Sequence, residues 1–235
     1  MNDCAHWRPP SQPLRGVVFD LDGLMFNTEE LYEQVGGEIL RRRGKIFTDE
    51  LLHQMMGRQS PVALGLMIEY HGLSDTVEIL AQESEVVFRE VLDTQLATMP
   101  GLLELLDQLE AAEIPKAIAT SSGRSFAHNV LGRFELSERF AFILTAEDIA
   151  HGKPRPDIYQ QAAARLNLEP PQILVLEDSA NGCRAGVAAG AYTVAVPAGR
   201  SRAHSFDGCA MVATSLADPR IYQALGLPRN VDTDR

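Results

Sequence analysis

Short apolar runs alternate with helix-like segments along most of the chain, and this alternation limits the possible folds more than any other feature. Runs of this length and composition are typical of strands that a parallel sheet buries on both faces. They lie at residues 16–20, 115–120, 141–145, 173–177 and 192–196. Parallel strands need crossover connections, which the intervening helices can provide. The pattern therefore predicts an α/β fold with a doubly wound, Rossmann-like parallel sheet that is covered by helices on both faces.

One insertion interrupts this alternation directly after the first strand. Residues 27–98 contain four helix-like segments in succession and no strand candidate. Asn27 and Glu30 have the spacing of a capping box at the first of these helices, and Gly72 is placed to end the third. We therefore expect a discontinuous core, an inserted four-helix cap domain and flexible ends. The expected boundaries are 15–26 and 99–225 for the core, 27–98 for the cap, and 1–14 and 226–235 for the ends.

Charge and hydropathy narrow the class of protein. The 235-residue chain has a formal net charge of −11 at pH 7, whereas a nucleic-acid surface needs clustered Lys and Arg. No apolar stretch reaches the roughly 20 residues of a membrane span, and the first residues lack the basic start and apolar core of a signal peptide. We expect a cytoplasmic monomer that contacts neither nucleic acid nor membrane, with its three cysteines reduced.

Acids, hydroxyls and one lysine follow the predicted strands. They are Asp20, Asp22, Thr120, Ser121, Ser122, Lys153, Glu177 and Asp178. Ligands of an open parallel sheet bind outside the carboxyl ends of its strands, so we expect these side chains to share one edge. Carboxylates this close together are costly unless a hard cation balances their charge, and Mg²⁺ with its oxygen ligands fits them. Because a lysine and hydroxyls suit a phosphoryl group, the set predicts phosphoryl transfer, with one acid as nucleophile and the acid two residues on as general acid and base.

These residues resemble the motifs of the haloacid dehalogenase superfamily of phosphotransferases, and the resemblance extends from about Gly16 to Ala198. "DLDG" is similar to the first family motif, "ATSS" to the second, "GKPRPDIY" to the third and "LEDSANG" to the fourth, in the family's order. The helical insertion lies where one subclass carries a small helical cap of the C1 type. The resemblance thus implies the subgroup that contains beta-phosphoglucomutase-like enzymes and phosphatases.

The resemblance also implies a role for each motif residue. Asp20 would be the nucleophile and Asp22 the general acid and base, while Thr120 and Ser121 would bond the phosphoryl group and Lys153 would offset its charge. The implied Mg²⁺ ligands are Asp20, the backbone carbonyl of Asp22, Asp178 and Glu177, the last either as a ligand or as a partner of one. Dehalogenases of the family lack the second acid of the first motif, so Asp22 argues against carbon–halogen cleavage.

Substrate choice depends in this subclass on residues of the cap and of the core edge. The candidates are Glu29, Tyr32, Arg58 and Gln59 in the cap, with Ser121, Ser122 and Arg124 in the core. The resemblance implies as substrate a small phosphorylated metabolite, either a sugar phosphate or a nucleoside monophosphate, that is hydrolysed through an aspartyl phosphate.

Two other functions stay open. The first is a hexose phosphomutase of the beta-phosphoglucomutase type. Such mutases carry a histidine twelve residues after the nucleophile and an arginine later in the cap, whereas Tyr32 and Ser60 occupy these places here. Tyrosine is a poor base at neutral pH, with an ordinary pKa near 10, so hydrolysis is favoured. The second is a binding module without activity, which the intact acids and lysine argue against.

Overall fold

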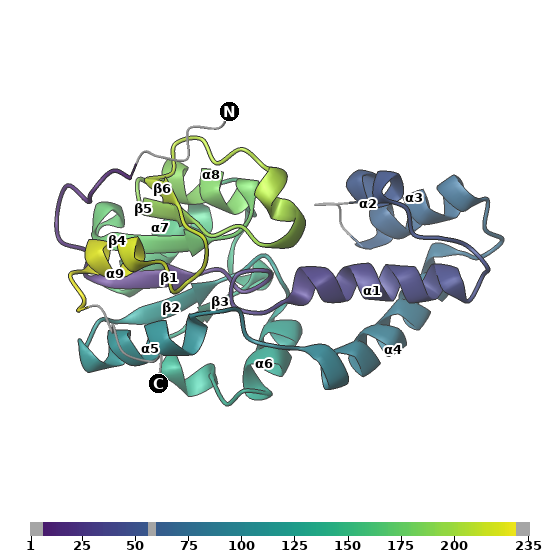
Figure 1. The fold of residues 1–235 in the computed structure, drawn as a ribbon, viewed down its shortest axis with the longest axis horizontal. Coiled ribbons are helices and arrows are strands. Elements are labelled where there is room, and N and C mark those ends of the chain that lie inside the picture. Colours follow the sequence, from purple (N-terminus) through teal and green to yellow (C-terminus); the bar gives the residue numbers. More distant parts are fainter. Residues whose placement is uncertain (1–6, 56–59, 229–235) are drawn as a thin grey trace. The chain divides into compact units, whose positions relative to one another are not determined.

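The computed structural model describes residues 7–55 and 60–228. Packing contacts divide the chain into two units, one formed by residues 1–26 and 98–235 and the other by residues 27–97. The first unit contains the sheet, and the described part of the second consists of helices and their connections (Figure 1).

Within the described residues, six strands form one parallel sheet in the order β3-β2-β1-β4-β5-β6 (Figure 1). The strands are β1 (Gly16–Phe19), β2 (Lys116–Ala119), β3 (Ile143–Leu144), β4 (Ile173–Glu177), β5 (Tyr192–Ala195) and β6 (Met211–Val212). The predicted α/β fold with a parallel sheet is confirmed. The sequence did not predict β6, because two residues are too short a run to show a strand pattern.

The strand order reverses beside β1, and this reversal places the helices. The chain moves outward from β1 to β3 and then continues at β4, on the other side of β1. Because parallel crossovers are right-handed, helices that accompany opposite directions cover opposite faces. The first direction includes α5 (Leu102–Ala111) and α6 (Arg124–Gly132), and the second includes α7 (Asp157–Arg165) and α8 (Ala180–Ala189). The point between β1 and β4 is therefore the topological switch point, where open α/β sheets bind their ligands.

A buried apolar cluster fixes α7 and α8 on one face of the sheet. It includes Val18, Ile158, Tyr159, Val175 and Ala185. The unit is completed by α9 (Pro219–Leu225) and by the short 3₁₀ helices η1 (Ser137–Arg139), η2 (Ala146–Asp148), η3 (Pro170–Gln172) and η4 (Gly199–Ala203).

Residues 27–97 form a helical unit with its own apolar core. Its helices are α1 (Thr28–Arg41), α2 (Asp49–Met55), α3 (Ser60–His71) and α4 (Val77–Gln95). The core side chains are Val35, Ile39, Leu40, Leu51, Leu64, Met67, Leu80 and Val87. Gly72 follows α3 with a φ of +59°, in the left-handed conformation that ends helices, as predicted. In the described part of the chain, no helix is both long and apolar enough to cross a bilayer.

The Asn27 side chain joins the two ends of the helical unit. It makes no capping bond to α1. Instead its Nδ2 donates to the carbonyl of Gln95 at 3.1 Å, and its Oδ1 accepts from the backbone N–H of Ala97 at 2.9 Å. The predicted capping box of Asn27 and Glu30 is therefore wrong, because the Asn27 amide is used to join the start of the unit to its end.

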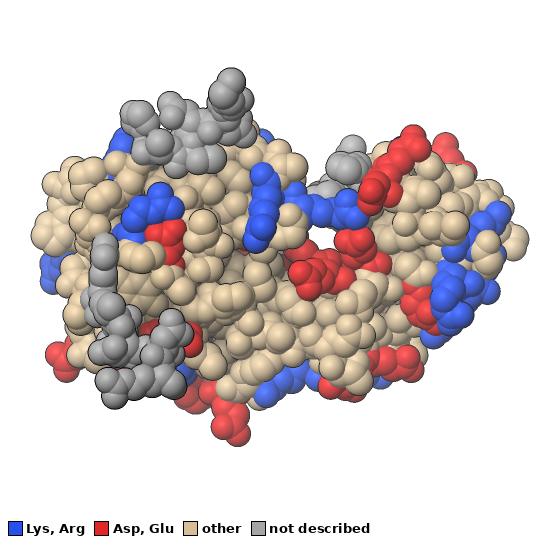
Figure 2. All heavy atoms as spheres, in the orientation of Figure 1, with Lys and Arg blue, Asp and Glu red and all other residues tan. Residues whose placement is uncertain are grey.

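Basic residues at the end of α1 are paired with acids. Arg43 Nη2 contacts Asp75 Oδ1 and Glu83 Oε2, each at 2.7 Å. The two arginines before it contact Glu38 at 2.7 and 2.8 Å. On the face drawn in Figure 2, basic and acidic side chains of the described residues are intermixed. The basic residues near the end of α1 therefore lie among acidic partners.

The segment before β1 is anchored to the sheet unit. Trp7 Nε1 donates to the Tyr192 hydroxyl at 3.1 Å. Arg8 Nη2 donates to the carbonyls of Gly208 and Cys209 at 2.8 Å each. The sequence predicts a flexible end here, but these contacts hold Trp7 and Arg8 against β5 and the loop before β6.

Candidate active site

The carboxyl ends of β1 and β4 bring the first and fourth motifs together. Phe19 pairs with Leu176 in the parallel register, and the backbone N–H of Asp20 donates to the Leu176 carbonyl at 3.0 Å. The next residues, Asp20 on one strand and Glu177 on the other, are therefore neighbours. On the other side of β1, Thr120 continues β2 by donating its N–H to the Leu144 carbonyl at 2.9 Å.

Three buried carboxylates form a cluster at this switch point. Oxygen atoms of Asp20, Glu177 and Asp178 all lie within 4.8 Å of one another. The residues are 6%, 0% and 2% exposed, respectively. Burial and mutual repulsion both oppose ionisation of such a set. The cluster consists of hard oxygen donors only, which is the donor set that Mg²⁺ prefers, so these residues fit that cation.

Lys153 lies against this cluster. Its ammonium contacts Asp20 Oδ1, and it donates to Glu177 Oε1 at 2.7 Å and to the Ala119 carbonyl at 2.9 Å. Burial lowers the pKa of Lys153, but the Asp20 and Glu177 carboxylates outweigh this effect and raise it above its ordinary value. The lysine is therefore a fixed positive charge beside Asp20.

For the pKa of Asp20, burial is the larger effect. Burial raises the pKa of Asp20 to about 8, opposed by Lys153 and reinforced by the charges of Glu177 and Asp22. Burial therefore opposes the ionised form of Asp20, which is the form that a nucleophile needs. A divalent cation among the carboxylates would favour the ionised form of Asp20.

Two hydroxyl groups contact the Asp22 carboxylate. Thr120 Oγ1 donates to Asp22 Oδ2 at 3.4 Å, and Ser122 Oγ contacts the same oxygen. The backbone N–H of Ser122 in turn donates to Thr120 Oγ1 at 3.0 Å. The structure thus brings the first and second motifs together, and Thr120 and Ser122 contact the residue that the sequence predicts as general acid and base.

The predicted core contacts for substrate differ in their surroundings. Arg124 begins α6 with its backbone N–H directed at the Glu147 carboxylate, 3.1 Å away, and its Nη2 contacts Asp148 Oδ1 at 2.7 Å. Its side chain is 56% exposed. Ser121, between Thr120 and Ser122, is exposed. Arg124 is therefore committed to an acidic partner, and its role toward substrate stays a prediction.

Two of the four predicted cap contacts, Glu29 and Tyr32, lie on α1 of the helical unit. Tyr32 is 50% exposed and stacks on Phe88 of α4, with ring centroids 4.6 Å apart. Glu29, one turn earlier, is half-buried. Arg58 and Gln59 lie outside the described residues. The role of these four residues in substrate binding stays a prediction.

Apart from Lys153, the sequence did not single out the residues that hold Glu177. Tyr159 on α7 donates its hydroxyl to Glu177 Oε1 at 2.7 Å. Ser179 donates its backbone N–H and its hydroxyl to Glu177 Oε2 at 3.2 and 3.0 Å. Gly182 lies so close that a Cβ there would be 1.7 Å from Glu177 Oε1. Each belongs to a motif quoted above, "GKPRPDIY" or "LEDSANG", so the motifs contain the signal although the pattern does not reveal the contacts.

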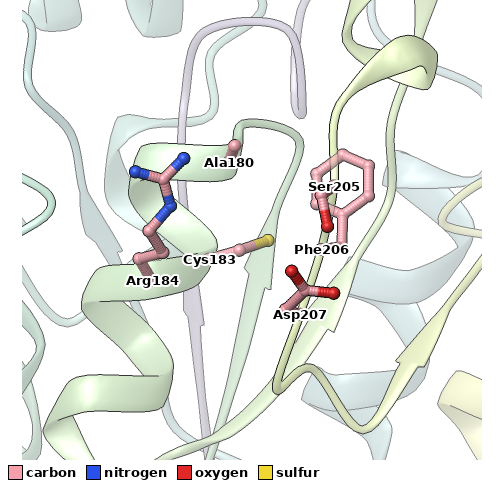
Figure 3. A pocket seen from close by; sticks show the side chains of 6 residues that line it. All are labelled: Ala180, Cys183, Arg184, Ser205, Phe206 and Asp207. Atoms are coloured by element: carbon pink, nitrogen blue, oxygen red, sulfur yellow. The ribbon is translucent and has the colours of Figure 1, made fainter.

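Two hollows of the sheet unit are lined by residues other than the acids of this cluster. One, of about 160 Å³, lies beside α8 and is lined by Ala180, Cys183, Arg184, Ser205, Phe206 and Asp207. Figure 3 shows the Cys183 thiol directed toward Phe206 and Asp207 in this hollow. The other, of about 80 Å³, lies near Gly23 and Met99. The acids at the switch point line neither of them, so charge and geometry identify the site.

Comparisons with known proteins agree with this geometry. A family model described as "Haloacid dehalogenase-like hydrolase" matches residues 17–196. A Drosophila melanogaster protein described as "Probable pseudouridine-5'-phosphatase" is 34% identical over 223 residues, covering 92% of this chain and 95% of that protein. The phosphorylated carbohydrates phosphatase of Thermotoga maritima is 30% identical over 177 residues, covering 75% of this chain and 82% of that protein.

The structure is also similar to that of a solved hydrolase. The crystal structure of a HAD family hydrolase from Deinococcus radiodurans, with bound phosphate and sodium, has a TM-score of 0.75 and 29% identity. The match covers 92% of this chain and 98% of that chain.

Proposed function

Since this chain belongs to the haloacid dehalogenase-like hydrolases and is a phosphatase of small phosphorylated metabolites, we propose that it uses Mg²⁺ and an aspartyl phosphate on Asp20 to hydrolyse a sugar phosphate or a nucleoside monophosphate. The observation that supports this most strongly is the buried set of Asp20, Glu177 and Asp178 with Lys153 at the switch point of the sheet. The cytoplasmic location and the monomeric state stay predictions.

The metal would be held by the carboxylates of Asp20 and Asp178, with the backbone carbonyl of Asp22. When bound, Mg²⁺ supplies positive charge to the phosphoryl oxygens and to the carboxylates. Lys153 adds a fixed positive charge on the same side, since its ammonium contacts Asp20. Positioning and charge neutralisation of this kind account for most of the acceleration in phosphoryl transfer.

The reaction proceeds in two steps. In the first, an Asp20 oxygen forms a bond to phosphorus while the ester P–O bond breaks, and Asp22 gives its proton to the departing alkoxide. In the second, Asp22 takes a proton from water, the water oxygen bonds to phosphorus, and the acyl phosphate P–O bond breaks. Inorganic phosphate leaves and Asp20 is again a carboxylate. Thr120 and Ser122 orient the Asp22 carboxyl group for both proton transfers.

Substrate class is supported by the named relatives. One is described as a pseudouridine-5'-phosphatase and another as a phosphatase of phosphorylated carbohydrates. Both descriptions name a phosphate ester of a small polar metabolite, and this supports a substrate of the same class for this chain.

A panel of phosphorylated sugars, nucleoside monophosphates and glycerol phosphates tests the proposal. Purified protein is assayed for phosphate release with Mg²⁺ and, after dialysis, with EDTA. We expect release from at least one sugar or nucleoside phosphate with Mg²⁺ and none above background with EDTA. Full activity in EDTA, or no release from any member of the panel, would contradict the proposal.

The same panel tests the mutase alternative. One arm contains beta-glucose 1-phosphate with a trace of glucose 1,6-bisphosphate, and both glucose 6-phosphate and free phosphate are followed. Tyr32 stands where a mutase needs its base, and it stacks on Phe88. We therefore expect release of phosphate to exceed conversion to glucose 6-phosphate. The opposite ratio would favour the mutase.

A further inference from the structure

The carboxylate of Glu177 receives four hydrogen bonds. Oε1 accepts from the Lys153 ammonium and from the Tyr159 hydroxyl, each at 2.7 Å. Oε2 accepts from the backbone N–H and the hydroxyl of Ser179, at 3.2 and 3.0 Å. A carboxylate has about four lone-pair positions on its two oxygens. In this arrangement Glu177 therefore has its acceptor capacity filled by protein donors, although it lies beside Asp20 and Asp178.

Tyr159 is placed to fix this carboxylate. The side chain is fully buried on α7, within the apolar cluster that joins α7 and α8 to the sheet. The Lys153 ammonium lies 5.1 Å from the centre of its ring. Burial raises the pKa of Tyr159, and the charge of Glu177 raises it further, so the hydroxyl remains a donor. The Tyr159 ring therefore lies near the Lys153 ammonium, and the Tyr159 hydroxyl binds Glu177, which Lys153 also contacts.

Gly182 leaves the space that the Glu177 carboxylate occupies. A Cβ at this position in α8 would lie 1.7 Å from Oε1 and 1.8 Å from Cδ of Glu177. No side chain can be added there unless the carboxylate moves. Tyr159 and Gly182 therefore define the position of Glu177 from two independent elements, α7 and α8.

We propose that Tyr159 is a positioning residue of this phosphatase: its hydroxyl fixes Glu177, which holds the Lys153 ammonium against the nucleophile Asp20. Glu177 then acts through Lys153, and Asp20 and Asp178 are the carboxylates that bind the metal. This inference rests on the proposed roles of Asp20 and Lys153. Without the hydroxyl, Glu177 can rotate, and Lys153 loses a fixed partner but keeps Asp20 and the Ala119 carbonyl. The loss is therefore partial, of the size that such outer contacts cause, about 10-fold.

Tyr159→Phe tests this inference, with Tyr222→Phe as the matched control. Tyr222 is also buried, on α9 of the same unit, and its substitution removes the same atom away from Glu177. For each protein, kcat and KM are measured at saturating Mg²⁺ on the best substrate of the panel. Mg²⁺ binding is measured by calorimetry without substrate, which needs no turnover. We expect Tyr159→Phe to lower kcat about 10-fold with KM and the Mg²⁺ Kd each within about threefold of wild type. Tyr222→Phe should leave all three unchanged.

Gly182→Ala displaces the same carboxylate from the other side. It should lower kcat by more than Tyr159→Phe, because the carboxylate itself must move. Gly132→Ala is its control, since a Cβ at Gly132 on α6 meets no atom within 4 Å. Far-UV circular dichroism checks that each variant is folded. A lower kcat in both variants, with Mg²⁺ binding retained, supports the inference even if one of them is poorly stable.

Two results would overturn the inference. In the first, the wild type hydrolyses a substrate and folded Tyr159→Phe has the same kcat. In the second, Tyr159→Phe weakens Mg²⁺ binding about 10-fold or more and regains full kcat at saturating metal, which would make Glu177 a metal ligand. A wild type that binds Mg²⁺ but hydrolyses nothing contradicts the proposed function instead. The calorimetric comparison still decides between the two roles of Glu177 in that case.

Discussion

At the scale of single residues, charge balance explains why the switch point suits a divalent cation. Fully ionised, the carboxylates of Asp20, Glu177 and Asp178 carry three negative charges, and Lys153 supplies one positive charge. Without Asp22, the remainder is two negative charges, which one Mg²⁺ ion would balance, and the charge of Asp22 adds to this need for a cation. Uncompensated charge is unfavourable in a buried site, and burial raises the pKa of Asp20 to about 8 for this reason.

Asp22→Asn tests whether Asp22 is the general acid and base, as distinct from the nucleophile Asp20. The amide can still accept from Thr120 and Ser122 but cannot transfer the proton, so we expect kcat to fall by about 10²- to 10⁴-fold. Mg²⁺ binding should persist, because the proposed ligand from this residue is its backbone carbonyl. Steady-state kinetics and calorimetry measure the two effects.

Asp207→Asn is the control for that substitution. Asp207 is an exposed acid at the hollow beside α8, apart from the acidic cluster, so its kcat should equal that of wild type. A rate for Asp22→Asn within about twofold of wild type would remove Asp22 from the proton transfers.

The motif acids could be predicted from sequence, but the contacts around them could not. Asp20, Thr120 and Asp178 each follow a strand, and parallel strands end at one edge, so their meeting follows from the fold. Tyr159 reads as an ordinary core residue of α7, and only the packing of α7 against the sheet brings its hydroxyl to Glu177. Long-range hydrogen bonds of this kind leave no periodic signal.

At the scale of elements, the helical unit depends on contacts between α4 and the helices that precede it. Leu80 on α4 is fully buried in the core of this unit, whereas its neighbour Ile79 is 51% exposed. We expect Leu80→Ala to lower the free energy of unfolding by about 2–5 kcal/mol, the usual cost of a large cavity in a core. Ile79→Ala should change it by less than about 0.5 kcal/mol, as is usual for surface substitutions.

Urea unfolding followed by circular dichroism measures both substitutions in the same helix. Equal losses for the two variants would mean that α4 does not bury the face that the structure assigns to it. Because the two residues are neighbours in one helix, the comparison is not affected by where in the helix each lies. Alanine has a slightly higher helix propensity than isoleucine, which lowers the expected loss for Ile79→Ala.

Strands that form apolar runs of four or more residues could be predicted more readily than shorter ones. The apolar runs that became β1, β2, β4 and β5 are continuous, and each lies in the sheet. β3 lies within the run predicted at residues 141–145, whereas β6, of two residues, was not predicted, and its strand character comes from its pairing with β5. At Asn27 the local spacing indicated a cap, but bonds to Gln95 and Ala97, far along the chain, take that amide.

At the scale of the whole molecule, the order of the strands makes the site. Since β1 and β4 are neighbours while the chain between them builds β2 and β3, the first and fourth motifs meet across a long stretch of sequence. The second and third motifs reach the same place from β2 and from the segment before α7. The family model spans all four motifs, from residue 17 to residue 196. The sheet is therefore the part of the chain on which the proposed chemistry depends.

Trapping of the covalent intermediate tests the central claim most directly. Wild-type protein is mixed with Mg²⁺ and the best substrate of the panel, quenched with acid during turnover, treated with borohydride to reduce an acyl phosphate, and digested for mass spectrometry. The account predicts a reduced residue at Asp20 in wild type and none in Asp20→Asn, which should also release no phosphate. Phosphate release by Asp20→Asn at the wild-type rate, or a trapped group on another residue, would contradict it.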